Sequence, residues 1–145
     1  MPFNTISVVG LGYIGLPTAA MFASKGKNVI GVDVNQKTVD TINAGNIHIV
    51  EPDLDVIVRD AVSQGYLRAV TTPEAADAFL IAVPTPFFNL DVASGIPQPD
   101  LSFVESAAKA VAVVLKKGDL VILESTSPVG ATEKMAAWLA ECRPD

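Results

Sequence analysis

The sequence predicts an α/β fold, in which a doubly wound parallel sheet carries helices on both faces. The predicted strands are mostly short apolar runs rather than alternations of apolar and polar residues, as expected for strands that are buried on both faces. Amphipathic helical patterns separate these runs along the chain. A glycine-rich turn joins the first strand to the first helix. The strand runs are residues 6–9, 29–32, 66–70, 78–83 and 120–123.

The first strand leads into a turn whose glycines have the spacing G-x-G-x-x-G. In such a turn Gly10 permits the sharp bend, Gly12 lets the backbone approach a pyrophosphate, and Gly15 lets the helix pack closely on the strand. The first N–H groups of the helix lack partners and the helix dipole is positive there, so an anion is favoured. The following helix has Leu16, Ala19, Ala20 and Ala23 on one face.

The second strand ends at Asp33, close to the spacing of ~20 residues expected for an acid that binds the adenosine ribose. A carboxylate there would repel a 2′-phosphate, which favours NAD over NADP, although the nearby Lys37 keeps NADP open. The glycines could also form an ordinary strand–helix turn, and Asp33 a solvated strand end. The order of strand, glycines, helix, strand and acid favours a Rossmann-type dinucleotide site instead.

Two helices are expected before the third strand, which could be an edge strand. Asn35 is the predicted N-cap of one helix and Gly45 its stop, whereas Asp53 is the predicted N-cap of the other and Gly65 its stop. The predicted apolar faces are Val39 and Ile42 in the first helix, and Leu54, Ile57, Val58 and Ala61 in the second.

The second half begins with a central strand and a long loop, residues 87–99, of the kind that is often functional. Ser102 and Glu105 form a candidate capping box for the next helix, with Lys116 and Lys117 in its last turn and Gly118 closing it. The strand at 120–123 is predicted to be buried. The final helix has Met135, Trp138, Leu139 and Cys142 on one face, and we interpret Cys142 as a core residue.

The doubly wound rules predict the strand order 3-2-1-4-5, with the topological switch point between strands 1 and 4. Ligands bind at the carboxyl ends of such strands, so the glycine turn, Asp33, residues 84–86 and residues 124–128 should converge on one crevice. Residues 1–145 contain no internal repeat or linker and are expected to form one domain. A six-strand dinucleotide fold would need one more strand after the final helix, so we expect a piece of a longer protein, truncated before the last strand.

The composition limits the classes of function. The 145 residues are 50% hydrophobic and 18% charged, with a net charge of −6, which indicates a globular domain. Without a basic patch, a long apolar segment or a signal peptide, we expect no nucleic acid or membrane as a partner. A single cysteine fits a reducing, cytoplasmic location. No metal site is expected.

Four motifs together resemble the N-terminal domain of the UDP-glucose/GDP-mannose dehydrogenase family. The resemblance implies two successive NAD-dependent oxidations that convert the C6 alcohol of a UDP-sugar to a carboxylate, through a thiohemiacetal and a thioester on a cysteine. It places that cysteine and the sugar-binding groups in a missing C-terminal half, so no catalytic residue is expected here, and it implies a homodimer. The motifs are residues 9–17, 31–35, 83–86 and 125–130.

The same resemblance implies cofactor contacts for individual residues. Tyr13 and Ile14 would meet the pyrophosphate through backbone N–H groups, and Asp33 would hold the adenosine ribose. Thr126 would lie near the nicotinamide ribose, with a possible assisting role at the catalytic water, although it could simply cap the final helix. Thr85 would flank the cofactor, although residues 84–86 could be a simple prolyl turn. The expected cofactor-binding set is Gly10, Gly12, Tyr13, Ile14, Gly15, Asp33, Val83, Pro84, Thr85, Ser125 and Thr126.

Two polar residues outside this set are candidates for acid–base chemistry. His48 is the single histidine, but it stands between isoleucines with no evident carboxylate partner, which favours a structural role. Glu51 is interpreted as a surface residue or loop anchor. Two other functions remain open: the NAD-binding domain of a β-hydroxyacid-type dehydrogenase, and a nucleotide-sensing module that reports to a partner.

Overall fold

The computed structural model describes residues 3–86, 99–125 and 127–144, and in them five parallel strands form one sheet in the predicted order β3-β2-β1-β4-β5. The 87–99 loop lies outside the described residues, apart from Pro99. The strands are β1 (Thr5–Val9), β2 (Asn28–Val32), β3 (Leu67–Val70), β4 (Ala78–Ile81) and β5 (Leu120–Leu123). The helices are α1 (Gly15–Ser24), α2 (Gln36–Asn43), α3 (Leu54–Ser63), α4 (Ser102–Ala112) and α5 (Ala131–Cys142).

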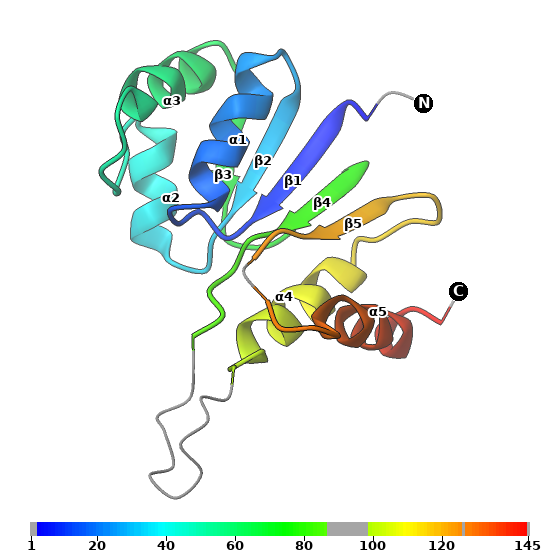
Figure 1. The fold of residues 1–145 in the computed structure, drawn as a ribbon. Helices are drawn as coiled ribbons and strands as arrows, with labels where there is room; N and C mark the ends of the chain where they lie inside the picture. Colours follow the sequence, from blue (N-terminus) through cyan, green and yellow to red (C-terminus); the bar gives the residue numbers. More distant parts are fainter. Residues whose placement is uncertain (1–2, 87–98, 126, 145) are drawn as a thin grey trace, which may run out of the picture.

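The sheet separates two layers of helices. Helices α1, α2 and α3 cover one face, and α4 and α5 cover the other (Figure 1). Successive side chains of a strand point to opposite faces, so β1 contributes Ile6 and Val8 to the core under α1 and Val9 to the core under α4. Strands β1 and β4 therefore contribute to both cores, as expected for strands buried on both faces, whereas Arg68 of the edge strand β3 is exposed.

The predicted N-cap of α2 is confirmed, whereas the predicted side-chain cap of α3 does not form. The Asn35 side chain accepts a hydrogen bond from the Lys37 backbone N–H at 3.0 Å. Asp53 occupies the N-cap position of α3, but its φ of 64° is left-handed and its side chain makes no cap hydrogen bond. A side-chain cap needs an extended backbone at that residue. Ile57 is exposed rather than part of the apolar face, which consists of Leu54, Val58 and Ala61.

Helix α4 begins and ends differently from the prediction. Ser102 is already helical, so no capping box forms, and the Asp100 carboxylate accepts the Ser102 backbone N–H at 2.9 Å instead. Glu105 is paired with Lys109. The helix stops at Ala112, well before Lys116 and Lys117. Beyond the end of the helix, the Asp119 carboxylate accepts the Lys116 backbone N–H at 2.8 Å and stabilises a separate turn before β5.

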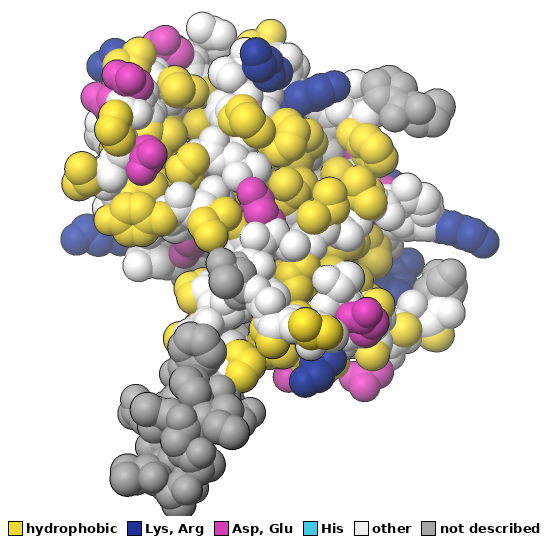
Figure 2. Space-filling model, viewed as in Figure 1, with side chains coloured by type: hydrophobic (Ala, Val, Ile, Leu, Met, Phe, Trp, Pro, Cys, Tyr) yellow, Lys and Arg dark blue, Asp and Glu magenta, His cyan; other side chains and the backbone are white. Residues whose placement is uncertain are grey.

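The last strand and helix are less buried than predicted. Leu120 and Ile122 of β5 are 40% and 41% exposed, because β5 is the outer strand and the described helices beside it cover one of its faces. Figure 2 shows apolar side chains on the surface in this region, beside α1. Cys142 is also exposed, not a core residue, because the packing of α5 ends with Leu139. No helix in the described ranges is long and apolar enough to cross a membrane.

Candidate functional site

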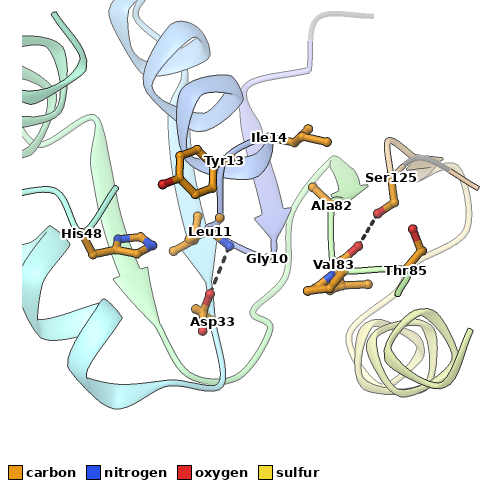
Figure 3. A pocket seen from close by; sticks show the side chains of 12 residues that line it. Gly10, Leu11, Tyr13, Ile14, Asp33, His48, Ala82, Val83, Thr85 and Ser125 are labelled. Atoms are coloured by element: carbon orange, nitrogen blue, oxygen red, sulfur yellow. Dashed lines mark hydrogen bonds between the residues drawn. The ribbon is translucent and has the colours of Figure 1, made fainter. Parts of the chain in front are cut away.

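The carboxyl ends of four strands lie side by side at one edge of the sheet. Val9 is in register with Val32 of β2 and with Ile81 of β4, and Ile81 is in register with Leu123 of β5. The residues that follow these four positions therefore meet above the switch point between β1 and β4, as predicted. They surround a hollow of about 300 Å³, which we call the glycine hollow (Figure 3). Its lining is Gly10, Leu11, Gly12, Tyr13, Ile14, Asp33, His48, Ala82, Val83, Pro84, Thr85 and Ser125.

The three glycines of the turn have different reasons to lack a side chain. Gly10 has a φ of 98°, and a Cβ on it would lie 2.7 Å from the Ala82 carbonyl oxygen. A Cβ on Gly15 would overlap the Gly10 carbonyl oxygen, so the close contact of α1 with the end of β1 requires glycine. A Cβ on Gly12 would meet no described atom within 4 Å. The protein's own packing explains Gly10 and Gly15, but it does not explain Gly12.

The start of α1 opens onto the glycine hollow. No side chain caps this helix, and its first turn contains no acidic residue. Tyr13 and Ile14 line the hollow with exposed fractions of 68% and 45%. An uncapped helix N-terminus presents N–H donors and the positive end of the helix dipole, equivalent to about half a unit charge. The hollow therefore offers an anion its binding groups mainly from the backbone.

Asp33 is fixed by backbone donors on both sides. One carboxylate oxygen accepts the Leu11 N–H at 3.1 Å, and the other accepts the Asn35 N–H at 2.9 Å. The first contact ties the end of β2 to the glycine turn, and the second fixes the start of α2. Each oxygen keeps a further lone pair for a donor in the hollow. The half-buried carboxylate is thus held in one orientation before any ligand arrives.

The opposite wall is formed by the segments that follow β4 and β5. The Ser125 hydroxyl donates to the Val83 carbonyl oxygen at 2.6 Å and so links the two segments. Behind them, a Glu124 carboxylate oxygen lies 2.6 Å from the Thr18 hydroxyl of α1. This contact fixes the position of α1 relative to the end of β5. Thr126 lies outside the described residues.

A second hollow of about 420 Å³ adjoins the first, and sequence reasoning missed it. It shares Gly10, Asp33, Val83 and Pro84 with the glycine hollow, and its remaining lining is largely apolar. We call it the apolar hollow. The sequence contains one indication of this hollow, because Phe103 and Ala110 are apolar residues of α4 that lie outside the helix face packed on the sheet. The other lining residues are Val9, Val32, Val34, Thr71, Thr72, Pro73, Ser106 and Ala107.

The structure brings together all the predicted site residues that it describes, except that Gly15 lies beneath the turn instead of on the hollow's wall. It also adds His48, which was outside the predicted set, to the residues around the hollow. This side chain is exposed and lines the glycine hollow, with its ring directed toward Leu11 and Asp33 (Figure 3). Glu51 is exposed, as predicted for a surface residue. Within the described ranges no cluster of acidic, histidine or cysteine side chains could hold a metal ion.

Comparisons with known proteins agree on one family. The profile of the UDP-glucose/GDP-mannose dehydrogenase family, NAD binding domain, matches residues 4–145. The UDP-N-acetyl-D-mannosamine dehydrogenase of Yersinia pestis is 72% identical over 145 residues, which are 100% of this chain and 33% of that protein. The NDP-N-acetyl-D-galactosaminuronic acid dehydrogenase of Ralstonia nicotianae is 69% identical over 143 residues, 99% of this chain and 32% of that protein.

A solved structure gives the same result. The UDP-D-ManNAc dehydrogenase of Pyrococcus horikoshii superposes with a TM-score of 0.88 at 42% identity, over 97% of this chain and 33% of that one. The chain thus spans about a third of the length of the curated relatives it matches.

Proposed function

This chain belongs to the UDP-glucose/GDP-mannose dehydrogenase family, and we propose that it holds NAD for an enzyme that oxidises a UDP-sugar at C6. The family match and the relatives make NAD its cofactor, and they support this function over a β-hydroxyacid-type dehydrogenase or a nucleotide-sensing module. When bound, NAD supplies the hydride acceptor. The residues described here bind and orient it.

The observation that carries the proposal is the open space at Gly12. A Cβ there would meet no described atom within 4 Å. Because Gly12 also lines the glycine hollow, the side chain would instead occupy the space through which a ligand approaches the backbone of the turn. The uncapped start of α1 beside it favours an anion. A diphosphate fits both features. We assign it to the backbone N–H groups of Gly12, Tyr13 and Ile14, with Gly10 and Gly15 shaping the turn.

Asp33 lines both hollows, so a cofactor bound to it would extend into the glycine hollow on one side and into the apolar hollow on the other. We assign the adenosine ribose to the Asp33 carboxylate, whose orientation is set by Leu11 and Asn35. The adenine then enters the apolar hollow, and the diphosphate runs along the glycine hollow. Nicotinamide and its ribose would lie against the opposite wall, at Val83, Pro84, Thr85 and Ser125. The family resemblance also assigns Thr126 to the nicotinamide ribose.

The activity of the whole enzyme extends the proposal beyond these residues. We assign 1–145 as the NAD-binding domain, and the sugar-binding and catalytic groups to the other two thirds of a protein of the relatives' length. The family resemblance assigns Thr126 an assisting role at the catalytic water. The substrate proposed is UDP-N-acetylmannosamine, oxidised to UDP-N-acetylmannosaminuronate with two NAD. Support comes from the 72% identity to a dehydrogenase of that name, although a galactosaminuronic acid dehydrogenase is nearly as similar.

The biological setting belongs to the same proposal. A nucleotide-linked uronic acid is an activated building block, so the enzyme would serve polysaccharide biosynthesis. The single cysteine, which is exposed and unpaired, fits a reducing cytoplasm. We further propose that the full-length enzyme is a homodimer, and that neither nucleic acid nor a membrane is a partner of this acidic chain.

Calorimetric titration with NAD and with NADP tests the cofactor assignment. Asp33→Asn should weaken NAD binding about tenfold, because the neutral amide is a poorer acceptor for the ribose hydroxyls. The same variant should narrow the preference for NAD over NADP, since the charge that repels a 2′-phosphate is gone. Asp60→Ala removes an exposed carboxylate of α3 outside both hollows and serves as the control. Unchanged NAD affinity in Asp33→Asn would refute the ribose assignment.

A further inference from the structure

We propose that His48 is a cofactor-binding residue and that its imidazole donates a hydrogen bond to the diphosphate of the dinucleotide. The inference rests on the proposed function, because it assumes that NAD occupies the glycine hollow. His48 belongs to neither the glycine turn nor the segments after β4 and β5. It lies in the connection between α2 and α3, which approaches the glycine hollow from the side of Asp33 (Figure 3).

The neighbours of His48 explain why this side chain faces outward. Ile49 is buried, with 7% of its surface exposed, and Ile47 is half-buried against the same core cluster. The two isoleucines anchor the connection on the protein. The histidine between them remains exposed, and its ring is directed over Leu11 toward the hollow (Figure 3). Anchored on both sides, the imidazole is held at the wall of the site instead of on a long free loop.

The charges around the glycine hollow give this imidazole a function. Among the described residues that line the hollow, none is a lysine or an arginine, and Asp33 contributes a negative charge. A diphosphate brings two more negative charges, whereas the start of α1 supplies only partial positive charge. Histidine has one ring N–H donor when neutral and two when protonated. His48 is therefore the lining side chain that can add a cationic donor to those of the backbone.

The position of His48 also selects the part of the cofactor that it contacts. It lines the glycine hollow, where Gly12, Tyr13 and Ile14 present their backbone, and it does not line the apolar hollow. A contact with adenine would require the second hollow. The imidazole should thus recognise the phosphates, and its removal should weaken only those ligands that carry them.

Binding of NAD, ADP and adenosine to the 145-residue chain tests the inference, with adenosine followed by NMR. We expect His48→Ala to weaken NAD and ADP about 5- to 10-fold, the effect of one charge-assisted hydrogen bond at an open site, and to leave adenosine binding unchanged. His48→Lys restores a cationic donor and should return NAD affinity to within about twofold of wild type. Val50→Ala, on the same connection and 88% exposed, should bind like wild type.

The outcomes separate this inference from the proposed function. If the wild-type chain binds NAD and His48→Ala binds it equally well, the diphosphate contact is refuted and the cofactor site remains. An equal loss for adenosine would also refute it, because the ring would then act on the nucleoside or on the shape of the hollow. Failure of the wild-type chain to bind NAD would refute both. Because His48 is exposed, the thermal unfolding midpoint of His48→Ala should match wild type.

Discussion

Two single substitutions, Gly12→Ala and Gly15→Ala, should have different effects: the first should weaken NAD binding, and the second should lower the stability of the fold. A Cβ at Gly15 would overlap the Gly10 carbonyl oxygen and lie 2.8 Å from its carbonyl carbon, and both are backbone atoms. Helix α1 must then move away from β1, and overpacking of this kind costs about 1–3 kcal/mol. With an unfolding entropy of about 0.3 kcal/mol/K for a chain of this size, a cost of 2 kcal/mol lowers the unfolding midpoint by about 7 °C.

Gly12→Ala should have the opposite pattern. Its Cβ would meet no described atom within 4 Å and its φ lies outside the left-handed region, so the native backbone accepts alanine. The substitution restricts the unfolded chain and should leave stability unchanged or raise it by about 0.4–1 kcal/mol. A methyl group between the turn and a diphosphate should weaken NAD binding by about tenfold or more.

Thermal unfolding followed by circular dichroism and NAD titration by calorimetry measure both quantities on the same samples. Gly31→Ala is a useful third variant, because its Cβ would meet the end of the flexible Leu11 side chain at 2.9 Å instead of backbone. It should cost less stability than Gly15→Ala. Full NAD affinity in Gly12→Ala would refute the diphosphate assignment. An unchanged midpoint in Gly15→Ala would refute the packing argument for the turn.

Two further predictions concern the fold. At the edge of β3 the Asn43 side chain donates to the Ala69 carbonyl oxygen at 2.9 Å and accepts the Ala69 backbone N–H at 2.8 Å, as a neighbouring strand would. Asn43→Asp removes the donor and should therefore lower the free energy of unfolding, measured by urea titration, by about 1–3 kcal/mol. Hydrogen bonds from the backbone N–H groups of Thr5 and Asn4 hold the pKa of Asp77 below its usual value. That contribution to stability is present above the unfolded-state pKa of about 3.9 and is lost as the pH falls through the lower folded-state pKa. Below about pH 4 the thermal unfolding midpoint of the wild type should therefore fall more steeply with pH than that of Asp77→Asn. Parallel curves of midpoint against pH for the two proteins would contradict this prediction.

Much of the fold follows from local patterns. Apolar runs identified β1, β2, β4 and β5, and the segment 66–70 was identified as the short strand β3. Right-handed crossovers together with the doubly wound rule then predicted the order of the five strands. The glycine stops after α2 and α3 are confirmed by φ values of 82° at both Gly45 and Gly65. These features are predictable because each depends on a few consecutive residues.

The errors at the helix starts concern features that depend on precise backbone geometry. The sequence around Asp53 and Ser102 contains good capping residues, yet neither side chain caps its helix. Capping depends on one pair of backbone angles and on where the first helical turn starts. At α4, Asp100 accepts the Ser102 N–H from two residues upstream, so the helix begins one residue earlier than a Ser102 cap would require.

The sequence by itself determined the order of the sheet and the elements that converge at its carboxyl edge, since the glycine turn and Asp33 each follow directly from a strand end. Only the tertiary structure decided what covers each residue. It exposed Leu120 and Cys142, opened the apolar hollow beside α4, and placed His48 on the wall of the site. The physical reason is that burial depends on elements distant in sequence, whereas strand and helix patterns record only whether a residue is apolar.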